Sequence, residues 1–340
     1  MLDEFTCAHG ASMRDETNGA YFLSEIAQAL EATRSRDALV HGLRTQAMFA
    51  HVVAALGGCT VVKEEDAGDL YVLDNDLRVP DFRIVTIDRR EVLVEVKNHR
   101  PSCSTQAFSL SSSYMDSLQR YCEAFGREML VAIYWSEWQM WTLLRREAFD
   151  VRADSYRVSF EDALKMNEMS LLGDVMIATA PPLALRLLAD TQKPRRCDPD
   201  GGAEFTVGAV ELLAAGNVVD DPREEQIAWF LMRYGGWTVA GTQPETKADK
   251  LVSFALEVWP GKLTEPSQGF EMIGFMSQML SREYNELTAD AEGVNLLTPD
   301  REPEELGIAI PYTFTGEKLR LWRFSVVPPM VRPDAEESDG

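Results

Sequence analysis

Near the start of the chain, apolar residues recur at helical spacing in two segments. The first spacing predicts a helix over residues 20–34, with apolar positions at Phe22, Leu23, Ile26 and Leu30. The second predicts a helix over residues 37–56, which begins at a suitable N-cap, Asp37, and ends before Gly57 and Gly58. Both helices precede a region of different periodicity.

Short apolar runs separated by polar turns follow, and they predict strands at 59–63, 70–73, 82–87 and 92–97. Helical spacing returns over residues 113–125. Two further apolar runs, 129–135 and 138–144, are typical of buried strands. Helices before and after a group of strands predict an α/β domain, in which a mixed sheet is flanked by helices.

The remaining pattern divides the chain into two folded parts. Residues 158–188 add a helix and two strands to the first domain, and the next segment, with Pro194 and Pro199, is the best linker. Beyond it we expect an α+β domain with strands at 204–219, 237–240, 306–314 and 318–327, and helices at 222–234, 247–258 and 267–287. The predicted organisation is a flexible N-terminus (1–19), a first domain (20–190), a linker (191–202), a second domain (203–330) and an acidic disordered tail (331–340).

Charged residues occupy special positions on two of the predicted strands. Asp81 follows Pro80 at the start of one strand, and Glu95-Val96-Lys97 closes the next one. Because side chains alternate along a strand, Glu95 and Lys97 point to the same face, whereas the Val96 side chain points into the core. The sequence therefore predicts that an acid, a second acid and a lysine meet at one place.

This combination fits the hydrolysis of a phosphodiester, which requires an activated water and a cation that neutralises the transition state. Mg²⁺ prefers oxygen ligands and uses only one or two carboxylates. Asp81 and Glu95 would supply these carboxylates, and the backbone carbonyl of Val96 would add a third ligand. Lys97 would then orient the attacking water or stabilise charge. Mg²⁺ is the expected cofactor, and Mn²⁺ is expected to substitute for it.

The pattern resembles the PD-(D/E)XK nuclease superfamily, which includes restriction endonucleases and Holliday-junction resolvases. The resemblance covers residues 37–145 and rests on Pro80-Asp81, Glu95-Val96-Lys97 and the order of helices and strands around them. It implies a restriction-endonuclease-like sheet, Mg²⁺ bound by Asp81 and Glu95, and a Lys97 that assists the attacking water. It also implies a DNA substrate and, for a chain of this size, a homodimer.

The chain departs from this family at two places. Many resolvase-like members carry a glutamate on the first core helix, where this chain has Gln46. An amide there weakens a second metal site, so a single metal is favoured, with Glu65 among the substitute carboxylates. The Gln-x-x-x-Tyr sequence of an exonuclease branch is also absent after Lys97.

Each of these residues also has a plainer interpretation. Glu95 and Lys97 would alternate in the same way on a solvated edge strand, although the adjacent run Val92-Leu93-Val94 indicates a buried one. Asp81 would also suit a turn after proline, and Gln46 a hydrogen-bonded core amide. His99 and Arg100 would contact the scissile phosphate or belong to a loop.

Composition bears on the partner and the compartment. The formal net charge of the chain is -22, which by itself argues against a nucleic-acid partner. The charge of the whole chain says little, however, about the charge of a single binding groove. Five cysteines without Cys-x-x-Cys spacing, and a polar N-terminus unlike a signal peptide, favour a reducing cytoplasm and no zinc site. No apolar run reaches the roughly 20 residues of a membrane span, so no membrane partner is expected.

The function expected from the sequence is a Mg²⁺-dependent DNA endonuclease of phage defence, restriction or DNA recombination and repair. The alternative is a nuclease-like scaffold with weak or no activity that acts through protein partners, which the acidic charge and Gln46 favour. An unrelated enzyme in residues 203–330 is the least favoured hypothesis, because no phosphate-binding loop or hydrolase motif occurs there. For that half we expect dimerisation, gating of the substrate or binding of a protein partner.

Overall fold

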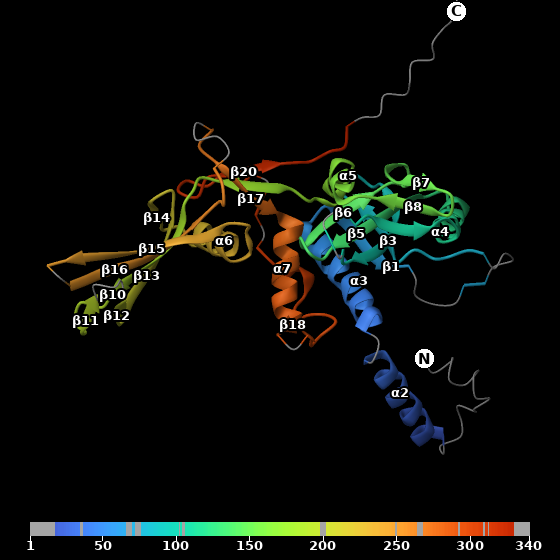
Figure 1. Cartoon of the computed structure of the whole chain (residues 1–340), viewed down its shortest axis with the longest axis horizontal. Coiled ribbons are helices and arrows are strands. Elements are labelled where there is room, and N and C mark those ends of the chain that lie inside the picture. The colour runs from blue at the N-terminus through green and yellow to red at the C-terminus, as the bar shows by residue number, and fades with distance from the viewer. Residues whose placement is uncertain are drawn as a thin grey trace, which may run out of the picture.

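A five-stranded sheet in the order β1-β2-β3-β5-β6 carries the motif residues in the computed structural model of the protein (Figure 1). β3 pairs with β5 in parallel, and the other neighbours pair antiparallel, so the sheet is mixed as predicted. Its strands are β1 (Cys59–Glu64), β2 (Phe82–Thr86), β3 (Glu91–His99), β5 (Glu128–Trp135) and β6 (Met140–Leu144).

The structure describes residues 18–34, 37–65, 70–71, 76–101, 103, 106–197, 202–248, 250–263, 268–291, 293–308, 310–311 and 313–329. The acidic tail predicted at 331–340 lies outside these residues. Residues 1–17 of the predicted N-terminal segment also lie outside them. The last two residues of that segment begin the first described helix, α2 (Asn18–Arg34).

Helices cover both faces of the sheet. α3 (Asp37–Leu56) packs on the face formed by Val92, Val94 and Val96, and α4 (Ser112–Ala124) packs on the face that carries Leu93. These two helices match the helices predicted from spacing at 37–56 and 113–125. Because both faces are covered, Val92, Leu93 and Val94 are all buried, and β3 is a central strand.

Local chemistry fixes the ends of these elements. The hydroxyl of Ser111 accepts a hydrogen bond from the backbone N–H of Tyr114 and caps α4. β2 starts directly after Pro80-Asp81, and a tight turn with Arg89 at φ 66° leads into β3. The strand predicted at 70–73 is not formed by Leu70 and Tyr71, while residues 72–73 are outside the described part. β1 instead pairs directly with β2.

The C-terminal half forms a second, antiparallel sheet in the order β14-β13-β10-β16-β15. Its strands are β10 (Leu183–Ala189), β13 (Val207–Ala214), β14 (Asn217–Val219), β15 (Thr238–Lys247) and β16 (Lys250–Trp259), and α6 (Pro222–Tyr234) packs against β13 and β10. A three-stranded sheet joins β17 (Glu271–Phe275), β9 (Met176–Thr179) and β20 (Leu321–Phe324). The remaining elements are β4 (Phe108–Ser111), β7 (Asp150–Arg152), β8 (Ser155–Val158), α5 (Phe160–Lys165), β11 (Arg195–Cys197), β12 (Ala203–Phe205), β18 (Ala289–Asp290) and β19 (Gly293–Val294).

Strand pairing connects the parts of the chain on either side of residues 191–202. β9 and β10 lie within residues 20–190, yet all their partners belong to the C-terminal half. β11, inside the predicted linker, pairs with β12, which lies just after it. The sequence pattern identified these strands but carries no information about which strand each would pair with.

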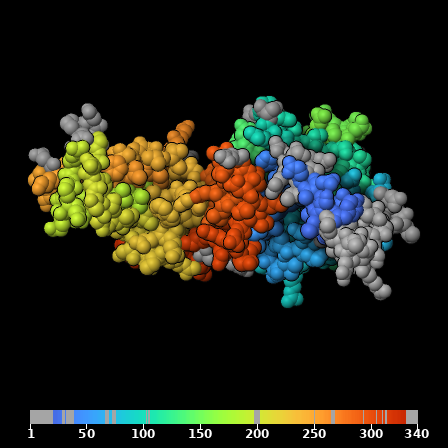
Figure 2. Space-filling view, turned by 90° about the horizontal axis from the view of Figure 1, so that it is seen from below, coloured from blue at the N-terminus to red at the C-terminus, as the bar shows by residue number. Residues whose placement is uncertain are grey.

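Helix α7 (Met276–Thr288) lies between the two halves and packs against α3 and β6 (Figures 1 and 2). Arg44 of α3 donates to the side chains of Asn285 and Thr288, and the Trp141 indole of β6 donates to Ser281 at 2.9 Å. The carboxylate of Asp174 accepts from the backbone N–H of Ser277 in the first turn of α7. One hydrophobic core therefore runs from the motif sheet into the C-terminal half.

Four predictions for the C-terminal half were wrong in type or extent. Residues 247–258, predicted as a helix, mostly form β16, whose long ladder with β15 and β10 outweighs the helical spacing of its apolar residues. The helix predicted at 267–287 is a strand followed by α7, and only 321–324 of the strand predicted at 318–327 is present. The described residues of 306–314 form no strand. None of the described helices is both long and apolar enough to cross a membrane.

Candidate active site

Asp81 stands at the entry to β2 and is held from two sides. The Gln46 side-chain amide of α3 donates a hydrogen bond of 2.6 Å to Asp81 Oδ1, and the Val96 backbone N–H donates one of 2.6 Å to Oδ2. In a strand, the N–H and C=O of one residue leave on the same edge. The carbonyl of Val96 therefore faces the same side of β3 as the Asp81 carboxylate.

Glu95 and Lys97 lie on the face of β3 that α4 covers. The Glu95 residue is only 1% exposed, and its Oε1 accepts hydrogen bonds from the Lys97 ammonium and, at 2.6 Å, from the Tyr114 hydroxyl. Lys97 Nζ also donates to the Tyr114 hydroxyl at 3.0 Å. The three side chains form a closed triangle of hydrogen bonds, which balances the cost of burying the carboxylate.

This triangle shifts the pKa values of Lys97 and Tyr114. Burial lowers the pKa of Lys97, but the attraction of Glu95 and the hydrogen bonds to Glu95 and Tyr114 raise it by more, so the net pKa lies above its usual value. Burial and the neighbouring Glu95 charge raise the pKa of Tyr114. At neutral pH, Lys97 is an ammonium and Tyr114 a neutral phenol.

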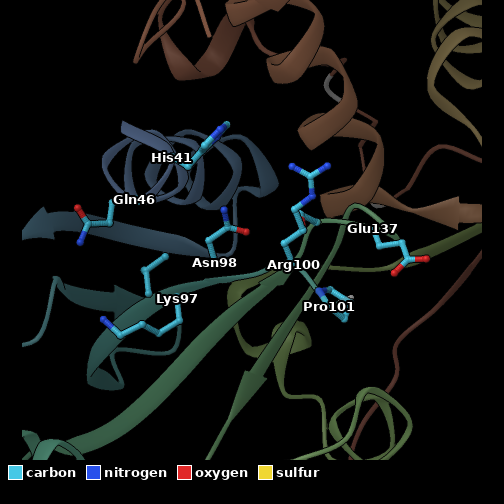
Figure 3. Close-up of a pocket in the computed structure, with 10 residues that line it drawn as sticks. His41, Gln46, Lys97, Asn98, Arg100, Pro101 and Glu137 are labelled. Atoms are coloured by element: carbon cyan, nitrogen blue, oxygen red, sulfur yellow. The ribbon is translucent and has the colours of Figure 1, made fainter. Parts of the chain in front are cut away.

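A cleft of about 860 Å³ opens beside Lys97 on the side of α3 (Figure 3). Its lining includes His41 and Gln46 from α3, residues 96–98 from β3, Arg100 just beyond that strand, and Ser136 and Glu137 from the turn after β5. Gln46 and Lys97 both border the cleft, so a molecule bound there would reach the edge of the Asp81 and Glu95 sites.

The supporting residues predicted from sequence occupy different positions. Arg100 is exposed and lines the cleft. His99 packs edge-on against Phe108 and Trp135, with ring centroids 5.6 and 5.1 Å away, on the α4 face of the sheet. His99 is therefore a packing residue in this structure, and its backbone carbonyl accepts from Ser136.

Glu65 is directed away from the predicted site. Its carboxylate accepts two hydrogen bonds from Arg83, at 2.9 and 2.6 Å, and a third, of 2.9 Å, from the Tyr121 hydroxyl. The hydrogen bonds from Arg83 lower the pKa of Glu65, outweighing burial, and Tyr121 lowers it further. The structure thus forms two hydrogen-bonded groups: Asp81 with Gln46 and the Val96 N–H, and Glu95 with Lys97 and Tyr114. Glu65 belongs instead to an ion-paired cluster.

Sequence reasoning missed Tyr114, which contacts both Glu95 and Lys97. The helical spacing of residues 113–125 placed it on the apolar face of α4, and this face packs on the strand face that carries Glu95. Arg78 was also missed. Its guanidinium lies over the Tyr114 ring, 4.9 Å from the centroid. The Lys97 ammonium lies at the same distance from that centroid.

The donor set at this site consists of hard oxygens: the Asp81 and Glu95 carboxylates and the Val96 carbonyl. Among the described residues, no three His, Cys, Asp or Glu side chains gather as a metal-binding group. Two carboxylates and one carbonyl suit Mg²⁺, which keeps several waters, and do not suit zinc, which prefers nitrogen and sulfur. The oxygen donors present are therefore of the kind that Mg²⁺ prefers.

No protein-family model and no curated protein sequence matches the chain. Among solved structures, the chain is similar to Hjc, a Holliday junction resolvase from the archaeal hyperthermophile Archaeoglobus fulgidus. The two are 15% identical, with a TM-score of 0.25, and the match covers 33% of this chain and 87% of the resolvase. Similarity of this extent assigns neither a fold nor an activity to the chain.

Proposed function

We propose that the protein is a Mg²⁺-dependent DNA endonuclease whose active site consists of Asp81, Glu95 and Lys97. The observation that carries this proposal is that the Asp81 carboxylate accepts from the backbone N–H of Val96, between Glu95 and Lys97, while Lys97 binds Glu95 and lines an open cleft. A buried carboxylate in hydrogen-bonding contact with a lysine, beside a second carboxylate, is the arrangement that metal-assisted phosphodiester hydrolysis requires.

Asp81, Glu95 and the Val96 carbonyl would hold the metal ion. When bound, Mg²⁺ would lower the pKa of a coordinated water and neutralise charge on the attacked phosphate. The Asp81 carboxylate is fixed in place by Gln46 and by the Val96 N–H, so its orientation is set before any ligand arrives. Such preorganisation avoids a reorganisation cost during the reaction.

Lys97 would act as a cation rather than as a base. Its ammonium is held by Glu95 and Tyr114. Because the Lys97 side chain is still 27% exposed, it also reaches the cleft. From this position it would donate hydrogen bonds to a phosphate oxygen and to the attacking water. Tyr114 would keep Glu95 and Lys97 in register, because its hydroxyl contacts both.

The acidic composition does not oppose this function at the cleft. Many arginines of the described region are bound to acids, as Arg83 is to Glu65 and Arg145 to Glu168, and these pairs offer little to a phosphate. Arg100 is exposed on the cleft wall beside Lys97 and has no acidic partner within the described part of the chain. A local positive edge can bind a nucleic acid even when the whole surface repels it, especially with a divalent cation present.

Cleavage of supercoiled plasmid DNA with Mg²⁺ or Mn²⁺ tests the proposal. Wild type should nick or linearise the plasmid, and Asp81→Asn, Glu95→Gln and Lys97→Ala should each reduce the rate at least roughly 100-fold. Asp116→Asn is the matched control, since Asp116 lies on α4 and pairs with Arg146 at 2.8 Å. Equal rates in wild type and the three site variants would disprove the assignment. A wild type that binds Mn²⁺ without cutting any DNA would favour the scaffold alternative.

A further inference from the structure

Two cavities approach Lys97 from opposite faces of the central sheet. The larger is the 860 Å³ cleft bordered by α3, which contains Arg100. The smaller, of about 290 Å³, lies on the α4 face and is lined by Arg78, Tyr114, three serines (Ser111, Ser113 and Ser117) and Asp76. Tyr114 lines this second cavity and hydrogen-bonds Lys97, which lines the first, so this pair of side chains lies between the two spaces.

Each cavity contains one guanidinium that has no acidic partner within the described part of the chain. Arg100 is exposed on the wall of the cleft, and Figure 3 shows its guanidinium turned away from the Glu137 carboxylate. Arg78 is exposed as well, and its contact is with the face of Tyr114. Stacking on an aromatic ring orients a guanidinium while leaving its N–H groups free to donate.

The acids near these arginines are engaged or point elsewhere. Asp76 lines the smaller cavity, but its carboxylate is paired with Arg120 at 2.7 Å. Other arginines close to the site are also neutralised, as Arg146 is by Asp116. In a chain with a net charge of -22, two unpaired guanidinium groups on either side of one lysine are suited to an anionic ligand.

We propose that one strand of the DNA substrate crosses Lys97 from one cavity to the other, with Arg100 binding a phosphate on one side of the scissile phosphate and Arg78 binding a phosphate on the other. This proposal rests on the proposed function and extends it to the path of the substrate. The hydroxyls of Ser111 and Ser113 on the same cavity wall would supply further donors for this phosphate. Arginine suits this role because its planar fork donates to two phosphate oxygens at once.

Fluorescence anisotropy in EDTA, where no metal-dependent cutting occurs, measures this binding with a labelled DNA duplex and with the matching single strand. Arg78→Ala and Arg100→Ala should each weaken binding of the preferred DNA about tenfold and reduce the slope of log K against log salt by about one. In the double variant, the same slope should fall by about two. Arg78→Lys and Arg100→Lys retain the charge and should keep most of the slope, which separates phosphate binding from misfolding.

Arg223→Ala is the matched control. Arg223 is exposed at the start of α6, and its substitution removes the same charge from the C-terminal half. Affinities and slopes in the Arg78 and Arg100 variants equal to those of Arg223→Ala would overturn the strand path, as would a wild type that binds neither DNA. Cleavage is scored separately. If DNA binding depends on Arg78 and Arg100 but no DNA is cut, the endonuclease proposal is overturned and the strand path is supported. If DNA is cut and neither arginine affects binding or cutting, the strand path is overturned and the endonuclease proposal is supported.

Discussion

The Gln46 amide donates a hydrogen bond of 2.6 Å to Asp81, from helix α3 to the first residue before β2. A carboxylate at position 46 would instead place two negative charges in contact, which is stable only with a cation between them. Gln46 therefore holds Asp81 in place without a metal, at the expense of a further metal ligand.

Gln46→Glu should convert this hydrogen bond into a metal-dependent contact. Without metal, we expect the variant to be less stable than wild type by about 1 kcal/mol, because like charges replace a hydrogen bond. With Mn²⁺, its affinity for the ion should rise about tenfold, since one more hard ligand is present. Isothermal titration with Mn²⁺ measures this. An affinity equal to that of wild type would show that position 46 does not adjoin the metal.

Tyr114→Phe should separate the role of the hydroxyl from that of the ring. Losing the donor to Glu95 and the acceptor for Lys97 should lower the cleavage rate constant kcat roughly tenfold, with an unchanged KM. The matched control is Tyr121→Phe on the same helix, whose hydroxyl donates to Glu65 at 2.9 Å. Equal kcat values for the two variants would contradict a positioning role for Tyr114.

Asp174 should make stability depend on pH. Burial raises its pKa to about 6 from the ordinary 3.8, against the hydrogen bonds from Ser277 that lower it. Because the folded state holds this proton more tightly than the unfolded state, the stabilising contribution is full below the unfolded pKa and is lost as pH rises through about 6.

Asp174→Asn removes this titration while keeping an acceptor for the Ser277 N–H. Its free energy of unfolding, relative to wild type, should rise by on the order of 3 kcal/mol between about pH 4 and about pH 8. Urea unfolding at the two pH values measures the difference. Asp162→Asn serves as the control, because hydrogen bonds from Ser159 and Lys165 lower the pKa of that exposed carboxyl. A wild type and an Asp174→Asn variant with parallel pH profiles would refute the assignment.

The packing of α7 predicts that the first half of the chain does not fold alone. A chain that ends at residue 202 would lack the partners of β9 and β10 and would expose the side of α3 where Arg44 meets Asn285 and Thr288. We expect it to unfold without cooperativity, whereas the full chain should show one sharp transition in circular dichroism. A cooperative transition in the short chain would contradict this expectation and support a first domain that ends before the linker at 191–202.

Local pattern was sufficient for the elements that hold the site. Helical spacing identified α3 and α4, and apolar runs around a polar turn identified β2, which Asp81 precedes, and β3, which carries Glu95. Contacts that close only in the folded chain could not be read in the same way. Tyr114 looked like any apolar-face residue of α4, and β10 gave no sign that β13 and β16 would flank it. The prediction for β16 was wrong for another reason: its run of apolar residues fits a strand as well as a helix.

Diffraction from crystals soaked in Mn²⁺ tests the metal site most directly. Anomalous scattering should place one Mn²⁺ ion in contact with the Asp81 and Glu95 carboxylates and the Val96 carbonyl, with Lys97 beside it. The same soak of Glu95→Gln crystals should lose the ion or leave it at low occupancy. Wild-type crystals in which Mn²⁺ binds elsewhere, or in which Asp81 stays bound to Gln46 and no ion is seen, would contradict the account.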